Sequence, residues 1–300
     1  MSNETLSGIV LLDKEAGISS QKAVFQVRRL FDVKKAGHGG TLDPMAEGLL
    51  PVLLGSATKL SDYLLTGDKG YLAGLRFGVE TDTLDTTGTV LSTSDKRPTR
   101  EQLEQALSLF RGQITQVPPM YSAISVGGEK LYKLARQGIE VEREARSVTI
   151  HRLTLQSFDG DSATLDIGCS KGTYVRTLIA DLGRALGCGA CMSSLRRTEA
   201  AGFQIEGSFT RLALEQLSSE GRLSEALLPP EVLFTDLPAV STIAFYDKLL
   251  FDGQKVLQKK TGSRLAPGQL ARWIRRGQFG GLVRETETEQ GSAVQAVWRL

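Results

Sequence analysis

The 300-residue sequence is poor in the residues that build metal centres and disulfide frameworks. It has three cysteines and two histidines, and only Cys188 and Cys191 have the spacing of a metal-binding pair. A structural zinc site needs four ligands, and only Cys169, His38 and His151 remain to complete one. We therefore expect no metal, inert buried thiols and the reducing environment of the cytoplasm.

Long hydrophobic runs are also missing. No segment approaches the roughly 20 apolar residues that a membrane-spanning helix requires, and the polar residues 1–7 do not resemble a signal peptide. The sequence lacks the Gly-x-Gly-x-x-Gly, P-loop and Gly-x-Ser-x-Gly motifs, so neither a nucleotide cofactor nor a serine nucleophile is expected. With 41% hydrophobic residues, it is expected to form one large domain and a small one.

A strong excess of charge of either sign is absent, because the formal net charge is only +2. The distribution is uneven, however: residues 247–300 contain ten Lys and Arg against five Asp and Glu. A basic C-terminal segment is suited to contacts with phosphates. A solvated surface is the alternative, and charge alone does not separate the two.

Periodic apolar patterns predict a mixture of strands and helices. Strands are expected at 8–12, 71–79, 148–155 and 163–169. Helices are expected after Ser19 or Ser20 and at 99–111, 130–137, 174–186 and 210–228, the second with a capping box of Thr99 and Gln102. The elements do not alternate regularly, which favours an α+β fold over a doubly wound sheet. Prolines near 228–238 predict a boundary before a strand-rich C-terminal module.

The most informative segment is the glycine-rich stretch 37–48, which contains Asp43 immediately before Pro44. Glycines let the backbone approach another molecule closely, and the proline makes the loop rigid around one carboxylate. Such a loop can present a reactive group. From residue types alone, the commoner interpretation is that Asp43 caps a helix over 45–54, with Pro44 at its first position.

A second acidic loop, 81–88, contains Asp82 and Asp85 among four threonines and a glycine. Two carboxylates at this spacing could suggest a magnesium site. Turns of this composition more often use such side chains to bond their own backbone. We therefore expect a turn without a metal.

Six motifs in order give the sequence a family resemblance. They are Leu-Leu-Asp-Lys at 11–14, Gly-Ile-Ser-Ser at 17–20, the stretch 37–48, Pro-Met-Tyr-Ser-Ala at 119–123, Cys-Ser-Lys-Gly-Thr-Tyr-Val-Arg-Thr at 169–177 and Leu-Arg-Arg at 195–197. Together they resemble the TruB-type tRNA pseudouridine synthases, whose signature is G-H-x-G-T-L-D-P-x-A-x-G. The resemblance covers about residues 8–235 and is weaker beyond.

The resemblance implies a cytoplasmic isomerase that converts uridine 55 in the T-loop of tRNA to pseudouridine, without a cofactor or a required protein partner. It implies that Asp43 is the catalytic carboxylate, that Arg176 keeps it ionised, and that Tyr71 stacks on the flipped base and is a candidate for proton transfer. His38, Tyr174 and Leu195 match family positions that bind the substrate. Whether the carboxylate attacks C1′ or C6, or a glycal forms, is left open.

The resemblance also implies a domain organisation. Residues 1–236 would form a catalytic domain around a mostly antiparallel mixed sheet flanked by helices, with an insertion at 118–146 that clamps the T-arm. Residues 237–300 would form a small PUA-like domain rich in β-structure that grips the acceptor end. The residues expected to contact RNA are Lys130, Arg136, Arg146, Arg196 and Arg197.

Two positions depart from the family pattern: Glu15 replaces a usual proline, and Gly39 replaces a usual threonine. Neither change removes a chemical group with an expected role. The main alternative to an isomerase is a non-catalytic tRNA chaperone that uses the same clamp. A glycoside hydrolase is disfavoured, because a second positioned carboxylate is not evident.

Overall fold

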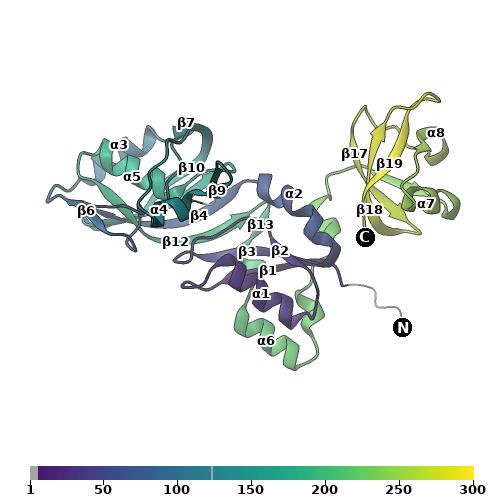
Figure 1. Ribbon diagram of the computed structural model, residues 1–300, viewed down its shortest axis with the longest axis horizontal. Helices are drawn as coiled ribbons and strands as arrows, with labels where there is room; N and C mark the ends of the chain where they lie inside the picture. The colour runs from purple at the N-terminus through teal and green to yellow at the C-terminus, as the bar shows by residue number, and fades with distance from the viewer. Residues whose placement is uncertain (1–5, 123) are drawn as a thin grey trace.

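The computed structural model describes residues 6–122 and 124–300. Most of residues 1–7 and the last residue of the motif at 119–123 lie outside the described part. The chain forms a large domain around one long sheet and a smaller C-terminal module, shown in yellow and green at one end of the molecule (Figure 1). Among the described residues, no helix is both long and apolar enough to cross a membrane.

Ten strands form the sheet of the large domain, in the order β14-β1-β3-β12-β4-β11-β10-β7, with β2 paired to β3 and β13 to β12. Only β1–β14 and β12–β3 are parallel pairs, so the expected mostly antiparallel mixed sheet is confirmed. Its strands are β1 (Gly8–Lys14), β2 (Ala36–His38), β3 (Glu47–Leu54), β4 (Lys69–Phe77), β7 (Gly112–Gln116), β10 (Arg146–Phe158), β11 (Ser162–Cys169), β12 (Ala190–Ala200), β13 (Phe203–Gln204) and β14 (Phe209–Thr210).

Four helices, Ser20–Leu30, Arg100–Ser108, Val175–Ala185 and Arg211–Ser219, pack their apolar faces against this sheet and share one hydrophobic core with it, whereas Leu64 of the helix Ser61–Thr66 belongs to a second core. Those of the large domain are α1 (Ser20–Leu30), α2 (Ser61–Thr66), α3 (Arg100–Ser108), α4 (Leu131–Arg136), α5 (Val175–Ala185) and α6 (Arg211–Ser219). The predicted capping box is confirmed, because Thr99 accepts from the Gln102 amide and Gln102 accepts from the Thr99 amide. Two small hairpins, β5 (Val79–Thr81) with β6 (Val90–Thr93) and β8 (Ser125–Val126) with β9 (Glu129–Lys130), lie outside the main sheet.

The helix expected over 45–54 is wrong, because this segment forms strand β3. Seven of its eight residues are buried. It pairs with β1 from Gly48 to Leu54, with β2 at 52–54 and with β12 at 47–48. A fully buried strand loses the two-residue alternation that normally identifies it. Pro51 was the missed signal, since a proline in the middle of a helix is strongly disfavoured. Asp43 therefore does not cap a helix here.

The strand-rich C-terminal module that the sequence predicts is confirmed. Its five strands are ordered β15-β17-β18-β19-β16 around a separate apolar core that contains the buried Trp273. The elements are β15 (Ala239–Thr242), α7 (Ala244–Phe251), β16 (Val256–Leu257), α8 (Gln258–Thr261), β17 (Leu270–Arg275), β18 (Gln278–Thr286) and β19 (Ala293–Arg299).

Aromatic side chains join the module to the large domain. The Phe234 ring meets Tyr63 of α2 edge-on at 4.9 Å and stacks with Phe279 of β18 at 6.3 Å, measured between centroids. Trp298 of β19 continues the cluster and donates its indole N–H to the Ser56 carbonyl. Buried aromatic contacts of this kind stabilise a fixed domain arrangement.

Replacing Phe234 with alanine should lower the free energy of unfolding by about 3–5 kcal/mol, because it leaves a cavity between the two domains. Phe245→Ala is the matched control, since that ring is 66% exposed. Urea denaturation measures the loss, and limited proteolysis should release the C-terminal module from Phe234→Ala only. Equal stability of the two variants would contradict the packing role of Phe234.

Candidate active site

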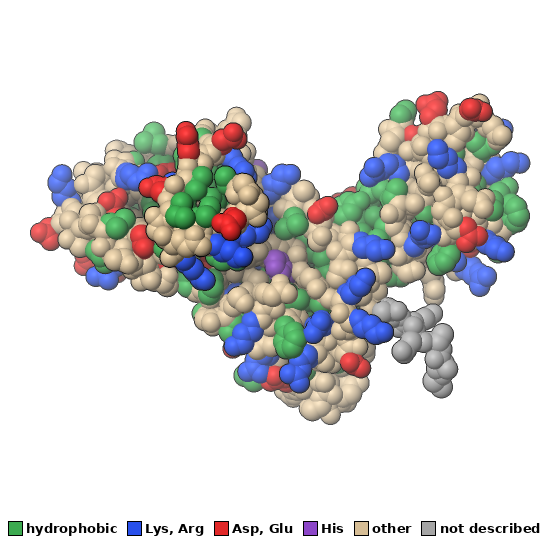
Figure 2. Space-filling view, viewed as in Figure 1, with side chains coloured by type: hydrophobic (Ala, Val, Ile, Leu, Met, Phe, Trp, Pro, Cys, Tyr) green, Lys and Arg blue, Asp and Glu red, His purple; other side chains and the backbone are tan. Residues whose placement is uncertain are grey.

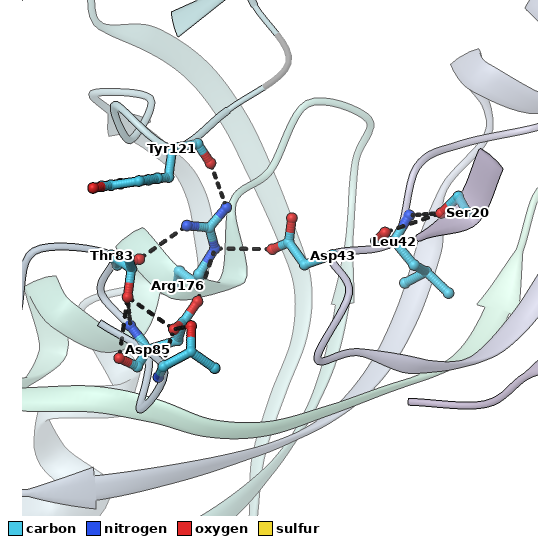
Figure 3. Close-up of polar contacts among 8 residues, drawn as sticks. Ser20, Leu42, Asp43, Thr83, Asp85, Tyr121 and Arg176 are labelled. Atoms are coloured by element: carbon cyan, nitrogen blue, oxygen red, sulfur yellow. Dashed lines mark hydrogen bonds and ion pairs between the residues drawn. The ribbon is translucent and has the colours of Figure 1, made fainter. Parts of the chain in front are cut away.

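The loop between β2 and β3 carries Asp43 and is fixed from two sides. The Ser20 hydroxyl, at the start of α1, donates to the Leu42 carbonyl at 2.9 Å and accepts from the Leu42 amide at 2.8 Å (Figure 3). The Gly17 amide donates to the Pro44 carbonyl at 2.7 Å. The residues before and after Asp43 are thus both anchored, so its carboxylate is held in a defined position.

Arg176, in the first turn of α5, lies against this carboxylate. Its Nε is 2.9 Å from Oδ2 of Asp43, and its side chain is 6% exposed (Figure 3). Its two terminal nitrogens donate to the backbone carbonyls of Thr83 and Tyr121 at 2.9 and 2.7 Å. The predicted pairing of Asp43 with Arg176 is confirmed, and Arg176 leaves the Oδ1 oxygen of Asp43 unbound.

The loop 81–88 forms the turn that its composition predicts. Oδ1 of the buried Asp85 accepts from the hydroxyls of Thr83 and Thr87 and from the Thr87 amide at 2.6–2.9 Å. Its other oxygen lies 3.9 Å from Nε of Arg176. Within the described residues, no group of three or more potential protein ligands could hold a metal ion.

Opposing effects set the acidity of Asp43. Burial raises the pKa of its carboxyl above the ordinary value, the Arg176 guanidinium lowers it, and the Asp85 carboxylate raises it again. The net direction is upward. Arg176 therefore opposes the effect of burial and favours the ionised form of the Asp43 carboxyl.

Two pockets share Asp43 and Arg176. The Tyr71 pocket has a volume of about 330 Å³ and is lined by Asp43, Arg176 and, among others, Tyr71, Tyr174, Leu195 and Arg197. The His38 pocket has a volume of about 680 Å³. It is also lined by Asp43 and Arg176 and, among others, by His38, Tyr121, Tyr132 and Arg136. The predicted catalytic and substrate-binding residues thus surround one ion pair.

Strand geometry explains how three of these residues reach the Tyr71 pocket. Tyr71 of β4 lies opposite Arg197 of β12, and Leu195 lies two residues before Arg197 on the same strand. Directly opposite residues and residues two apart on a strand share a face. Burial raises the pKa of the Tyr71 phenol, so the phenol is neutral at neutral pH.

Tyr174 precedes α5 and is held by a residue that the sequence did not single out. The side chain of Gln116 accepts from the Tyr174 amide at 3.0 Å and donates to its carbonyl at 3.3 Å. Gln116 is buried at the end of β7, shortly before the segment 118–146. A single glutamine within a polar stretch carries no sequence signal for this role.

The residues expected to contact RNA lie in different environments. Lys130 is exposed in β9 and Arg146 is exposed at the start of β10. Arg136 of α4 lies over the Tyr132 ring at 5.6 Å. Lys and Arg side chains gather across the middle of the face shown in Figure 2, between the large domain and the C-terminal module.

The two adjacent arginines of β12 require a correction. Arg196 is part-exposed and pairs with Asp13 at 2.7 Å and Glu47 at 3.0 Å. Arg197 is only 1% exposed, so the expectation that it contacts RNA phosphates is wrong. Successive strand residues point to opposite faces of a sheet, so they cannot both share one phosphate-binding surface.

Replacing Gln116 with leucine should lower the free energy of unfolding by about 1–3 kcal/mol, because it leaves the Tyr174 amide without its partner, whereas the Tyr174 carbonyl still accepts from the Leu178 amide. Gln113→Leu, at an exposed position of the same strand, is the control and should change stability little. Urea denaturation followed by circular dichroism compares the two. A loss in Gln113→Leu as large as in Gln116→Leu would contradict the proposed role.

Comparisons with known proteins agree with this geometry. The sequence matches the family model described as TruB family pseudouridylate synthase (N terminal domain) over residues 28–175, and that of the tRNA pseudouridylate synthase B C-terminal domain over residues 176–235. It is 49% identical over 249 residues to tRNA pseudouridine synthase B of Aromatoleum aromaticum, covering 83% of this chain and 80% of that protein. The corresponding protein of Chromohalobacter salexigens is 47% identical over 283 residues, covering 94% of this chain and 91% of that protein.

Solved structures also match nearly the whole chain. A chain of a Cbf5-Nop10-Gar1 complex gives a TM-score of 0.73 at 26% identity, covering 96% of this chain and 83% of that one. A chain of an H/ACA RNP bound to a substrate RNA containing 2′-deoxyuridine shares the fold, with a TM-score of 0.72 at 24% identity. The match covers 97% of this chain and 84% of that one. The fold, the two family models and the close relatives agree: the chain belongs to the TruB family of pseudouridylate synthases.

Proposed function

We propose that this protein isomerises uridine to pseudouridine in tRNA and that Asp43 is its reactive carboxylate. The observation that carries the proposal is the 2.9 Å pair between Arg176 Nε and Asp43 Oδ2 at the junction of two pockets. A part-buried carboxylate, paired with a buried arginine and left with one oxygen that Arg176 does not bind, is a feature that simple RNA binding does not need. The names of the close relatives give the same activity and substrate class.

The chemistry fits a site built from protein side chains alone. The reaction breaks the N1–C1′ bond, turns the uracil ring, joins C5 to C1′, releases the C5 proton and places a proton on N1, so substrate and product have the same composition. The oxygen of Asp43 that Arg176 does not bind acts on the nucleoside. Tyr71 and Leu195 enclose the base, and the neutral Tyr71 phenol stacks on it and assists the proton transfer.

The substrate nucleotide must leave its stack to reach Asp43, which costs a few kcal/mol. His38 lines the second pocket and can fill the space that the base leaves, since stacking recovers about 1–3 kcal/mol per base. His38 should therefore affect binding more than the chemical step.

We assign the substrate as uridine 55 in the T-loop of tRNA. The insertion 118–146 supplies Tyr132 and Arg136 to the His38 pocket, where an aromatic ring and a guanidinium can hold unstacked loop bases and backbone. Lys130, Arg146 and Arg196 extend the contacts with phosphates, and the module 237–300 acts as a PUA-like domain on the acceptor end. The protein works in the cytoplasm and needs no protein partner, because one chain supplies the whole site.

A T-arm stem-loop with tritium at uridine C5 tests this function. Wild type should release tritium to water, and Asp43→Asn should reduce the rate by on the order of 10⁴-fold or more, because the reactive carboxylate is lost. Asp95→Asn, at an exposed loop position, is the control and should retain the wild-type rate.

Tight binding of the stem-loop without tritium release from wild type would instead identify the rival function, a non-catalytic tRNA chaperone. Release from Asp43→Asn at the wild-type rate would exclude Asp43 as the reactive group while leaving the isomerase activity intact.

The raised pKa of Asp43 predicts a pH dependence. The rate of tritium release should fall as pH decreases and Asp43 becomes protonated, with a midpoint above the ordinary aspartate value of 3.8. Asp85→Asn should move this midpoint to lower pH, because it removes a negative charge that raises the pKa of Asp43. Asp82→Asn, in the same loop, is the control. An equal shift of the pH midpoint in both variants would contradict a specific effect of the Asp85 charge on Asp43.

A further inference from the structure

Arg197 is a buried cation without a carboxylate partner among the described residues. Its Nε donates to the Leu49 carbonyl at 2.7 Å and its Nη2 to the Gly40 carbonyl at 3.1 Å. Both acceptors are neutral backbone groups. Placing an unneutralised guanidinium at 1% exposure is costly, which calls for a reason beyond packing.

Gly40 begins the segment that leads to Asp43. Its φ of +144° is suited to glycine, and its carbonyl is one of the two groups that Arg197 holds. The other, Leu49, lies in β3 on the far side of the same loop. Arg197 therefore ties together the two ends of the loop that presents the reactive carboxylate.

The position of Arg197 also directs its charge into the Tyr71 pocket. It lies directly opposite Tyr71, and both residues line the pocket together with Asp43. After burial, the charge of Arg197 is the largest influence on the pKa of His38, which it lowers, and it also lowers the pKa of Lys69. The positive charge of Arg197 therefore acts on a residue of each pocket, His38 in one and Lys69 in the other.

The other arginine of the pocket cannot supply free positive charge. Arg176 bonds Asp43 through Nε and has Asp85 at 3.9 Å, and its terminal nitrogens are bound to backbone carbonyls. Lys69 also lines the pocket and donates to the carbonyls of Leu64, Leu65 and Gly67 at the end of α2. Burial lowers the pKa of its ammonium to about 8, so its charge is less secure than that of a guanidinium, which stays protonated.

We propose that Arg197 is the positioning residue that stabilises the detached uracil ring as an anion, while it holds the two ends of the Asp43 loop. This inference rests on the proposed function. When the N1–C1′ bond breaks, its electron pair remains on the ring, which carries a negative charge until C5 bonds to C1′. The C5 proton is then lost and N1 gains a proton, so the product is an isomer of the substrate. A fixed cation in a desolvated pocket favours that charge without reorganising.

Arg197→Gln and Arg197→Lys test the role of this charge. Arg197→Gln should slow single-turnover tritium release by about 100-fold or more, and Arg197→Lys should recover most of the rate because it keeps the charge. The Kd for the T-arm stem-loop should change by less than about threefold in both, since Arg197 does not reach the RNA backbone. Arg184→Met, at an exposed arginine paired with Asp181, is the control.

A nuclear magnetic resonance titration of His38 tests the charge of Arg197 directly, because the pKa of His38 would not change if Arg197 had only a packing role. The chain has only two histidines, so His151→Gln assigns the signals. The pKa of His38 should rise in Arg197→Gln and stay at the wild-type value in Arg197→Lys and Arg184→Met. This measurement does not require turnover, so it separates failure of the inference from failure of the proposed function.

Several results would overturn the proposal. A weakened Kd with an unchanged rate in Arg197→Gln would make Arg197 a phosphate contact after all. If Arg197→Gln and Arg197→Lys lose the same fraction of the rate and the pKa of His38 does not change, Arg197 has only a packing role. If Arg197→Gln does not fold, Arg197→Lys decides: a near-normal rate supports the role of the charge, and a rate as low as that of Asp43→Asn excludes it.

Discussion

The contact between Asp43 and Arg176 is the interaction on which the site depends. Arg176 binds the loop that carries Asp43 through Nε, the loop 81–88 through the Thr83 carbonyl, and the segment 118–146 through the Tyr121 carbonyl. Three segments far apart in the sequence therefore meet at one guanidinium. Any change that displaces α5 would displace all three, which explains why Gln116 fixes the residue at its start.

The long sheet supplies the rest of the geometry. Neighbouring strands β3, β12 and β4 place Leu49, Arg197 and Tyr71 beneath the loop, while the opposite face of β12 carries Arg196 and its acidic partners. Two adjacent arginines thus have unrelated surroundings: Arg196 is paired and part-exposed, and Arg197 is buried and lines the pocket that Asp43 also lines. Alternation along a strand is enough to separate their roles.

Much of this could be predicted from the sequence, for identifiable reasons. The capping box of Thr99 and Gln102 is a local pattern, and the pairing of Asp43 with Arg176 followed from family-like motifs. Strand β3 was missed because burial on both faces removes its alternation, although Pro51 argued against a helix. The roles of Gln116 and Arg197 depend on contacts between distant strands and loops, and no local pattern encodes such contacts. The domain boundary near residue 236 stays a prediction.

The aromatic cluster of Tyr63, Phe234, Phe279 and Trp298 has a consequence for the range of ligands. Because the C-terminal module cannot swing without exposing these rings to water, its distance from Asp43 is preset. A ligand that contacts Asp43 and the C-terminal module at the same time must span that fixed distance. The aromatic contact between the two domains would then select ligands by their length, independently of the base that enters the pocket.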